Sequence, residues 1–408
     1  MDRDTLIWLR SPPGQTLLQE LAALELHATN LLRELSRLRD QYPPELARAA
    51  VEQTLLRRRA QAKFPSADRL FFTREALEQA SSAPVAKYRA RRFAEYRQVA
   101  DLCCGIGGDA LALADAGSHI IAVDHNPVRL AIAAANAEEL GQVDNMTFVC
   151  ADLLTTAPPA AEAIFCDPGR RAGGKRRFHV EQYEPPLSRI LTWRTNAPAL
   201  AIKMAPGVDP AELPSDVDSE LEFISLDGEL KEAVLWCAPL ATTRRRATVL
   251  RTDATNDGSL TSQQHRVQTF TLTEDASRPL IPLTSPRGFL YEPDPAVIRA
   301  GLVAELAAQI GTTQLDAQIA YLTGDTLVPT PFARVWHILD WMPFNLKRLR
   351  ARLRDLDAGA VTVKKRGAPI DPNTLARQLS GKGERSLVVA LTRIADQRAV
   401  LICAERCS

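Results

Sequence analysis

The sequence predicts an α/β fold built on a doubly wound parallel sheet, with a helical segment before the sheet and a smaller α+β segment after it. Three observations predict this fold. Short apolar runs alternate with alanine- and leucine-rich helical stretches from residue 97 to residue 204, as in buried parallel strands joined by crossover helices. A glycine-rich turn follows the first apolar run. The two flanking segments carry an excess of positive charge.

The fold prediction centres on residues 98–124, QVADLCCGIGGDALALADAGSHIIAVD. Val99–Cys104 is a short apolar run suited to a buried strand, and the glycines at 105, 107 and 108 follow it directly. A helical pattern then leads to a second apolar run that ends at Asp124. This order of strand, turn, helix, strand and acid is typical of one βαβ half of a nucleotide-binding sheet. Glycines allow a ligand to lie against the backbone beside a helix N-terminus, and the acid can accept hydrogen bonds from ribose hydroxyls.

The spacing of the acid and the glycines distinguishes classes of nucleotide-binding protein. Dinucleotide enzymes use G-x-G-x-x-G, whereas this turn is preceded by an acid inside the first strand. Asp101-x-x-x-Gly105-x-Gly107 resembles motif I of class I S-adenosylmethionine-dependent methyltransferases. The resemblance implies S-adenosylmethionine as cofactor, with Asp101, Gly105 and Gly107 at its methionine part and Asp124 at its ribose. A nicotinamide oxidoreductase and a sheet that binds nothing remain alternatives.

Further strands are expected along the chain, and they complete the seven-stranded Rossmann-like sheet that the resemblance implies, with its last pair antiparallel. After Asp124, Asn126-Pro127 opens a helix to Leu140, because proline suits a first helical turn. Asp152, just beyond the third strand, resembles the family acid that contacts the adenine amine. The expected strands after the first are His119–Val123, Met146–Cys150, Glu162–Cys166, Ala199–Met204, Leu221–Leu226 and Ala233–Cys237.

The fourth strand ends in Asp167-Pro168-Gly169-Arg170, the second informative motif. In a doubly wound sheet of order 3-2-1-4-5, the turns after strands one and four are neighbours at the ligand-binding edge. Methyltransferases of exocyclic base amines carry [D/N/S]-P-P-[Y/F/W] here. The resemblance therefore implies that Asp167 and Pro168 position the methyl acceptor. Glycine replaces the second proline and Arg170 the aromatic, so Arg170 is expected to stack on the acceptor or bind a phosphate.

The segment after this motif offers further candidates. Phe178, Tyr183 and Trp193 are candidates for an aromatic ring that stacks on a base. Gly173–Arg177 reads as a basic loop that closes over an anionic substrate, with a solvated loop as the alternative.

Four segments are expected: a helical domain at 1–96, the methyltransferase domain at 97–240, a linker with a β-hairpin and a helix at 241–330, and an α+β domain at 331–408. The last has the order βαβαββ and resembles a THUMP-like domain, which implies an association with RNA. The first two segments together resemble trimethylguanosine synthase, through Asp124-His125-Asn126-Pro127 and Asp167-Pro168. That enzyme's cap-stacking tryptophan is absent, so a cap substrate is not implied.

Length and composition limit the class of protein. A chain of 408 residues indicates two or three domains. No run approaches the ~18 apolar residues of a membrane span, and the charged N-terminus is not followed by a secretory apolar core. Seven cysteines without C-x-x-C spacing predict reduced thiols in a cytoplasmic protein rather than disulfides or a structural metal site. The sequence carries no signal of oligomeric state.

The net charge of +1 conceals an uneven distribution: +5 over residues 1–98, +7 over residues 340–408 and −11 between them. The basic flanks are expected to hold a polyanion such as RNA, and solvated helix faces are the alternative. In Lys87–Phe93, cations alternate with aromatics. This pattern suits either RNA contact or a helix that docks its aromatics on the sheet while its arginines face water.

These observations predict a cytoplasmic S-adenosylmethionine-dependent methyltransferase that acts on RNA. A methyltransferase of small molecules or proteins, and a non-catalytic RNA-binding protein that retains the fold, are the alternatives.

Overall fold

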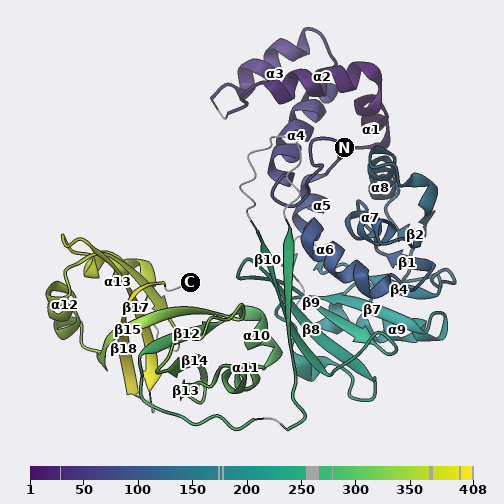
Figure 1. Ribbon diagram of the computed structural model, residues 1–408. Coiled ribbons are helices and arrows are strands. Elements are labelled where there is room, and N and C mark those ends of the chain that lie inside the picture. Colours follow the sequence, from purple (N-terminus) through teal and green to yellow (C-terminus); the bar gives the residue numbers. More distant parts are fainter. Residues whose placement is uncertain are drawn as a thin grey trace. The chain divides into compact units, whose positions relative to one another are not determined.

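The computed structural model describes residues 1–27, 29–172, 175–176, 179–253, 266–277, 279–366, 371–394 and 397–406. The chain divides into two compact units, and Figure 1 shows their helices and strands. The first unit contains residues 1–220, 232–242 and 252–267, and the second contains residues 221–231, 243–251 and 268–408.

The first unit begins with helices, as predicted. Prolines occupy the first turns of α2, α4 and α6, where the missing N–H has no intrahelical partner anyway. The Thr73 side chain accepts a hydrogen bond from the Ala76 N–H at 3.2 Å and caps α5. The helices are α1 (Arg3–Arg10), α2 (Pro12–Ala23), α3 (Leu31–Arg39), α4 (Pro44–Ala60), α5 (Arg74–Gln79) and α6 (Ala83–Ala90).

One sheet contains all seven strands predicted for the methyltransferase domain. Its order is β11-β10-β8-β9-β7-β4-β1-β2-β3. The strands are β1 (Gln98–Leu102), β2 (His119–Asp124), β3 (Met146–Cys150), β4 (Ala163–Cys166), β7 (Ala199–Met204), β8 (Ser219–Leu226), β9 (Glu229–Cys237), β10 (Arg245–Thr252) and β11 (Val267–Thr273). Crossover helices are α7 (Gly108–Asp115), α8 (Pro127–Glu139) and α9 (Leu187–Thr192).

The strand pairing follows the predicted order. β1 pairs in parallel with β2 and β4, β2 with β3, and β4 with β7, which is the expected order 3-2-1-4-5. β7 and β9 are antiparallel. Two strands beyond the predicted seven extend the sheet, because β10 pairs in parallel with β8 and β11 follows β10 in the strand order. Both fall in the segment 241–330, which was expected to be a linker with a β-hairpin and a helix.

The shorter elements of the first unit connect these strands. A two-stranded ladder joins β5 (Arg171–Ala172) to β6 (Lys175–Arg176). The 3₁₀ helices are η1 (Arg91–Phe93), η2 (Val143–Asn145), η3 (Val180–Gln182), η4 (Trp193–Thr195) and η5 (Pro210–Glu212).

The second unit is built on a sheet of order β13-β14-β12-β15-β18-β17-β16. The predicted βαβαββ order is confirmed as β15 (Ala333–Pro343), α12 (Leu346–Asp355), β16 (Ala358–Lys365), α13 (Pro372–Leu379), β17 (Arg385–Ile394) and β18 (Gln397–Arg406). The strands before it also come from the segment expected as a linker: β12 (Phe289–Pro293), β13 (Thr313–Asp316) and β14 (Ile319–Gly324).

A single helix expected over 296–310 is two helices, α10 (Pro295–Ala300) and α11 (Val303–Ile310). Gly301 lies between them with a φ of +74°, a left-handed conformation that ends a helix. No helix among the described residues is long and apolar enough to cross a membrane. Within the same residues, no group of three or more His, Cys, Asp and Glu side chains is placed to hold a metal ion.

Candidate active site

The carboxyl ends of β1, β2 and β4 meet at one edge of the sheet. The Asp167 N–H donates to the Leu102 carbonyl at 3.1 Å, which places the turn after β4 beside β1. The Cys104 N–H donates to the Val123 carbonyl at 3.0 Å, which joins the glycine turn to β2. The two motifs that the sequence singled out therefore lie at the same edge, as predicted from the strand order.

The glycine turn needs left-handed backbone at three positions. φ is +63° at Cys103, +57° at Gly105 and +84° at Gly107. A Cβ on Gly107 would lie 3.2 Å from the Ala133 Cβ, so this glycine allows the turn to approach α8 closely. A Cβ on Gly105 would meet nothing within 4 Å, so the backbone there borders open space. Cys103 is not a glycine, so its positive φ strains the backbone. Local strain of this kind is found at binding turns.

Asp124 joins the end of β2 to the glycine turn. Its buried carboxylate accepts hydrogen bonds from the Gly105 N–H at 2.9 Å and from the Asn126 N–H at 2.8 Å, one on each oxygen. Each oxygen keeps a second acceptor position for a ligand. Asp152 is exposed and lies next to Ala151, whose N–H donates to the Asp124 carbonyl at 3.2 Å. Asp152 and Asp124 therefore end neighbouring strands.

Asp101 is completely buried in β1, and neither of its carboxylate oxygens has a hydrogen-bond partner among the residues that the structure describes. Burial raises the pKa of Asp101 well above its usual range, and the negative charges of Asp109 and Asp167 raise it further. The positive charges of Arg89 and Lys203 act in the opposite direction. An unpaired buried carboxylate is costly unless it is protonated or meets a cation.

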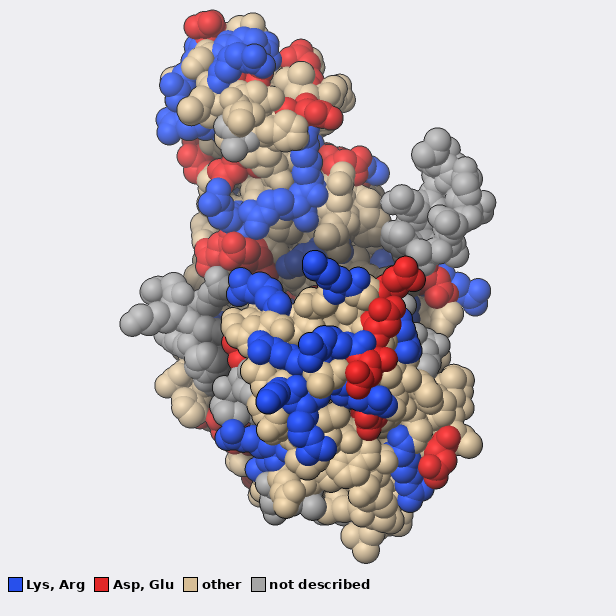
Figure 2. Space-filling view, turned by 90° about the vertical axis from the view of Figure 1, so that its left-hand side faces the viewer, with Lys and Arg blue, Asp and Glu red and all other residues tan. Residues whose placement is uncertain are grey.

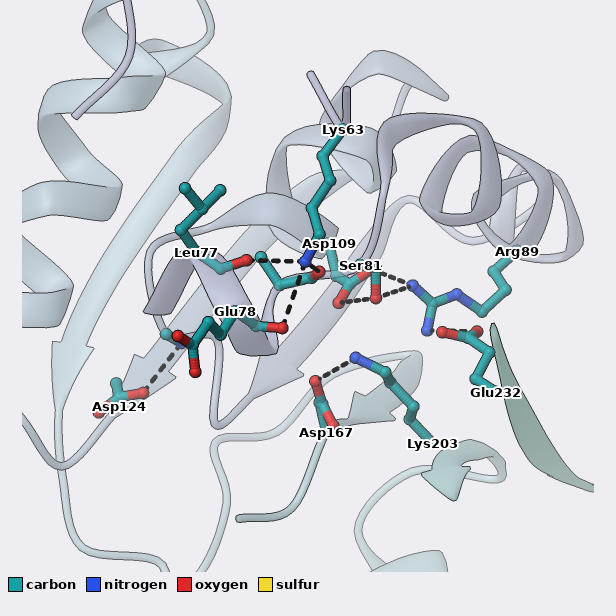
Figure 3. A network of polar contacts seen from close by, with 12 residues as sticks. Lys63, Leu77, Glu78, Ser81, Arg89, Asp109, Asp124, Asp167, Lys203 and Glu232 are labelled. Carbon is teal, nitrogen blue, oxygen red and sulfur yellow. Dashed lines mark hydrogen bonds and ion pairs between the residues drawn. The ribbon is translucent and has the colours of Figure 1, made fainter. Parts of the chain in front are cut away.

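The charges that act on this carboxylate belong to a buried ion cluster, and Figure 3 shows the side chains of the cluster pointing toward one another. The Arg89 guanidinium from α6 pairs with Asp109 at the start of α7 and lies 3.0 Å from the Glu232 carboxylate of β9. Arg89 also donates to the Ser81 hydroxyl at 2.9 Å. Its side chain is only 2% exposed, and its guanidinium lies over the Phe165 ring. The cluster therefore connects the N-terminal helices to the sheet behind the glycine turn.

Lys203 is a residue of this edge that sequence reasoning missed. Its ammonium lies 2.6 Å from the Asp167 carboxylate, and the two side chains are 3% and 23% exposed. The other oxygen of Asp167 forms no hydrogen bond with the described residues. A lysine inside the apolar run Ala199–Met204 was a visible signal, because a buried ammonium needs a partner. Its partner was not visible in the sequence.

The remainder of the β4 motif is held by local contacts. Pro168 is buried, and Gly169 forms a two-hydrogen-bond bridge with Glu184, at 2.8 and 2.9 Å. Arg170 is half-buried, and its Nη1 is buried and forms no hydrogen bond with the described part of the chain. This group is suited to an anionic ligand.

Two of the three aromatic residues expected to stack on a base are buried. Tyr183 and Trp193 are buried in the core, so the expectation that either presents its ring to a ligand is wrong. Phe178 and three residues of the predicted basic loop, Gly173, Gly174 and Arg177, lie outside the described residues.

The basic-aromatic run Lys87–Phe93 docks on the sheet. Phe93 is buried against Phe165 and Trp236, which confirms the docking interpretation for the aromatic ring. Two of the arginines also turn inward, so the expectation that they face water is wrong for them. Arg89 is in the buried cluster, and Arg92 stacks over Trp236 at 4.4 Å and pairs with Glu220 at 2.6 Å. Buried carboxylates on the sheet explain this inward orientation.

Comparisons with known proteins support the interpretation of the fold. Family models match a methyltransferase domain at residues 99–167, a THUMP domain-like family at 333–406 and a domain of unknown function at 2–60. The crystal structure of a putative methyltransferase from Porphyromonas gingivalis W83 covers 100% of this chain and 97% of its own, with a TM-score of 0.71 at 21% identity. That likeness shows a shared fold.

Two relatives show the family. They are uncharacterized S-adenosylmethionine-dependent methyltransferases of Mycobacterium tuberculosis, from strains CDC 1551 / Oshkosh and ATCC 25618 / H37Rv. Each is 39% identical over 354 residues, which cover 84% of this chain and 92% of the relative. With this identity over most of its length, and with the glycine turn and its acids at one sheet edge, the chain belongs to a family of S-adenosylmethionine-dependent methyltransferases.

Proposed function

We propose that this methyltransferase acts on RNA, and that the edge formed by β1, β2 and β4 is its active site. The observation that carries the RNA substrate is the C-terminal segment, which matches a THUMP domain-like family and carries a net charge of +7 over residues 340–408. Positive charge of this size attracts the phosphate backbone.

The residues at this edge fit S-adenosylmethionine. The buried, unpaired carboxylate of Asp101 suits the ammonium of its methionine part, and the open space beside Gly105 and the close approach at Gly107 suit a ligand that lies along the backbone. Asp124 holds the turn and retains acceptor positions for the ribose hydroxyls. Asp152, at the neighbouring strand end, suits the adenine amine.

The turn after β4 positions the acceptor in this proposal. When bound, the cofactor supplies an electrophilic methyl group on its sulfonium. Lys203 fixes one oxygen of Asp167, and the other oxygen accepts a hydrogen bond from the N–H or O–H of the attacking atom. Pro168 shapes the turn, and Arg170 binds a phosphate beside the acceptor. Gly169 and Arg170 depart from the motif of base-amine methyltransferases. The group that accepts the methyl is therefore either an amine or a hydroxyl of the substrate.

The test is methyl transfer from labelled S-adenosylmethionine to fractionated total RNA from a strain that lacks the protein, followed by nucleoside mass spectrometry. We expect one modified nucleoside to gain label. Asp167→Ala is expected to abolish turnover with near-normal cofactor affinity. Label found only in protein or small molecules would overturn the RNA substrate, and retained turnover in Asp167→Ala would relocate the acceptor site.

We also propose that the chain divides into segments at 1–96, 97–240, 241–330 and 331–408. We propose further that the protein is cytoplasmic and that its first two segments resemble trimethylguanosine synthase.

A further inference from the structure

The second unit carries two helices that pack on the same face of its sheet. Leu349 and Leu353 of α12 and Leu375 and Leu379 of α13 are buried in one cluster with side chains of β16, β17 and β18. These leucines recur at helical spacing, so the opposite faces of both helices point away from the sheet. The Arg350 Nε donates to the Gln378 carbonyl at 3.3 Å and joins the two helices.

The outward faces of these helices are basic, and Figure 2 shows Lys and Arg gathered on the side of the molecule where α12 lies. Six exposed cations form what we call the α12–α13 surface. None of the six forms an ion pair with any residue that the structure describes. Five of them are on the two helices and Lys382 follows α13; the five are Lys347, Arg348, Arg350, Arg354 and Arg377.

Many other basic residues of the chain are held by internal partners. Arg57 donates to the Leu70 carbonyl at 2.9 Å. Arg89 is in the buried cluster of the active-site edge. In the second unit, Lys364 lies 2.6 Å from Glu292. The excess positive charge of the N-terminal segment is therefore partly engaged in holding the fold, whereas that of the α12–α13 surface faces solvent.

We propose that the α12–α13 surface docks the phosphate backbone of RNA, an inference that deepens the proposed function and rests on it. Arginine and lysine side chains bind phosphate oxygens and release counterions from the nucleic acid. Neither α12 nor α13 contains an aromatic residue that could stack on a base. The surface therefore holds RNA through its backbone, with no dependence on base sequence.

The test uses the full-length triple variant Lys347→Gln, Arg350→Gln, Arg354→Gln. Its binding to a fluorescently labelled RNA hairpin is measured by anisotropy between about 50 and 200 mM salt. We expect affinity to fall about tenfold or more at the lower salt concentration, and the slope of log affinity against log salt to flatten by about two to three. The matched control is Arg33→Gln, Arg37→Gln, Arg39→Gln on α3, which removes the same charge from another exposed basic helix. This control is expected to bind RNA like the unmodified protein.

The possible results separate this inference from the proposed function. Equal RNA affinity in the triple variant and the unmodified protein would overturn the docking surface, and so would an equal loss in the α3 control. Loss of binding to phosphatidylserine vesicles with RNA binding intact would also overturn it, in favour of a lipid surface. If the triple variant loses RNA binding but no RNA is ever methylated, the surface stands and the RNA substrate fails. Calorimetry with S-adenosylmethionine should give equal affinity in all three proteins, which checks that the variants fold.

Discussion

Asp101 is the residue whose charge state matters most at the active-site edge. It is completely buried, its oxygens lack partners, and two of the charges near it are the carboxylates of Asp109 and Asp167. The positive charges of Arg89 and Lys203 offset part of this negative charge, but both side chains are paired with other carboxylates. A cation that enters the site would therefore favour the ionised form of Asp101 over the protonated form.

From this we predict that cofactor binding is linked to proton release. Below its raised pKa, Asp101 is protonated in the unliganded protein, and the cofactor's ammonium favours its carboxylate. Affinity for S-adenosylmethionine should therefore rise as the pH increases through this raised pKa. Calorimetry in buffers of different ionisation enthalpy should show a proton released on binding. Asp101→Asn should abolish that proton release, and an unmodified protein that releases none would contradict the role of Asp101.

Asp124 gives a second prediction at the same scale. Asp124→Ala removes a proposed partner of the ribose hydroxyls and should weaken cofactor binding by about 1–3 kcal/mol. Titration calorimetry measures this change. The Gly105 and Asn126 N–H groups also lose an acceptor, so thermal unfolding of the variant must be measured beside its affinity. Affinity equal to that of the unmodified protein would remove Asp124 from the site.

Between elements, a buried ion cluster links α6 to the sheet. Arg89 extends from α6 to Asp109 on α7 and to Glu232 on β9, and Phe93 follows it into the core. A buried ion cluster of this kind contributes less to net stability than its Coulomb attraction suggests, because burial removes the hydration of every charge. Removing one member is nevertheless costly, since it leaves the partners buried and unpaired.

Arg89→Met is therefore expected to lower the free energy of unfolding by about 3–5 kcal/mol. Arg91→Met is the control, because Arg91 is exposed two residues away and should change stability by less than about 0.5 kcal/mol. Urea denaturation, followed by the fluorescence of buried tryptophans, measures both. Equal stability of the two variants would show that the cluster does not hold α6 on the sheet.

At the scale of the whole molecule, charge separates two kinds of binding. At the active-site edge, Asp101 and Asp124 are buried and Asp167 is partly buried, so salt screens their interactions only weakly, whereas Asp152 is exposed. The α12–α13 surface consists of exposed cations, which salt screens strongly. The two binding events should therefore respond differently to ionic strength.

We predict that raising salt from about 50 to 200 mM weakens RNA binding by about a thousandfold if all six cations of the surface contact phosphates. Over the same range, affinity for S-adenosylmethionine should change by less than about threefold. Anisotropy measures the RNA binding, and calorimetry on the same protein preparation measures the affinity for S-adenosylmethionine. RNA binding that is insensitive to salt would exclude a phosphate-backbone contact.

Much of the fold could be predicted from local sequence. Buried parallel strands leave apolar runs, so the order of β1 to β4 and β7 could be inferred from runs such as Ala199–Met204 and the glycine turn. Helix caps such as Thr73 and Asn126 depend on neighbours within three residues. The place of β12 to β14 in the second sheet was missed, because their pairing depends on partners distant in the chain.

For the proposed site, the sequence by itself determined where the glycine turn, Asp101, Asp124 and Asp167 lie on the strands and turns, since strand ends and turn residues follow from period and composition. Only the tertiary structure decided which charges meet. Arg89 pairs with a glutamate of β9 that is 143 positions away, and Lys203 with Asp167, 36 positions away. Such pairs form because burial in a low-dielectric core requires each charge to find an opposite one, and the folded sheet, rather than spacing along the chain, selects that partner.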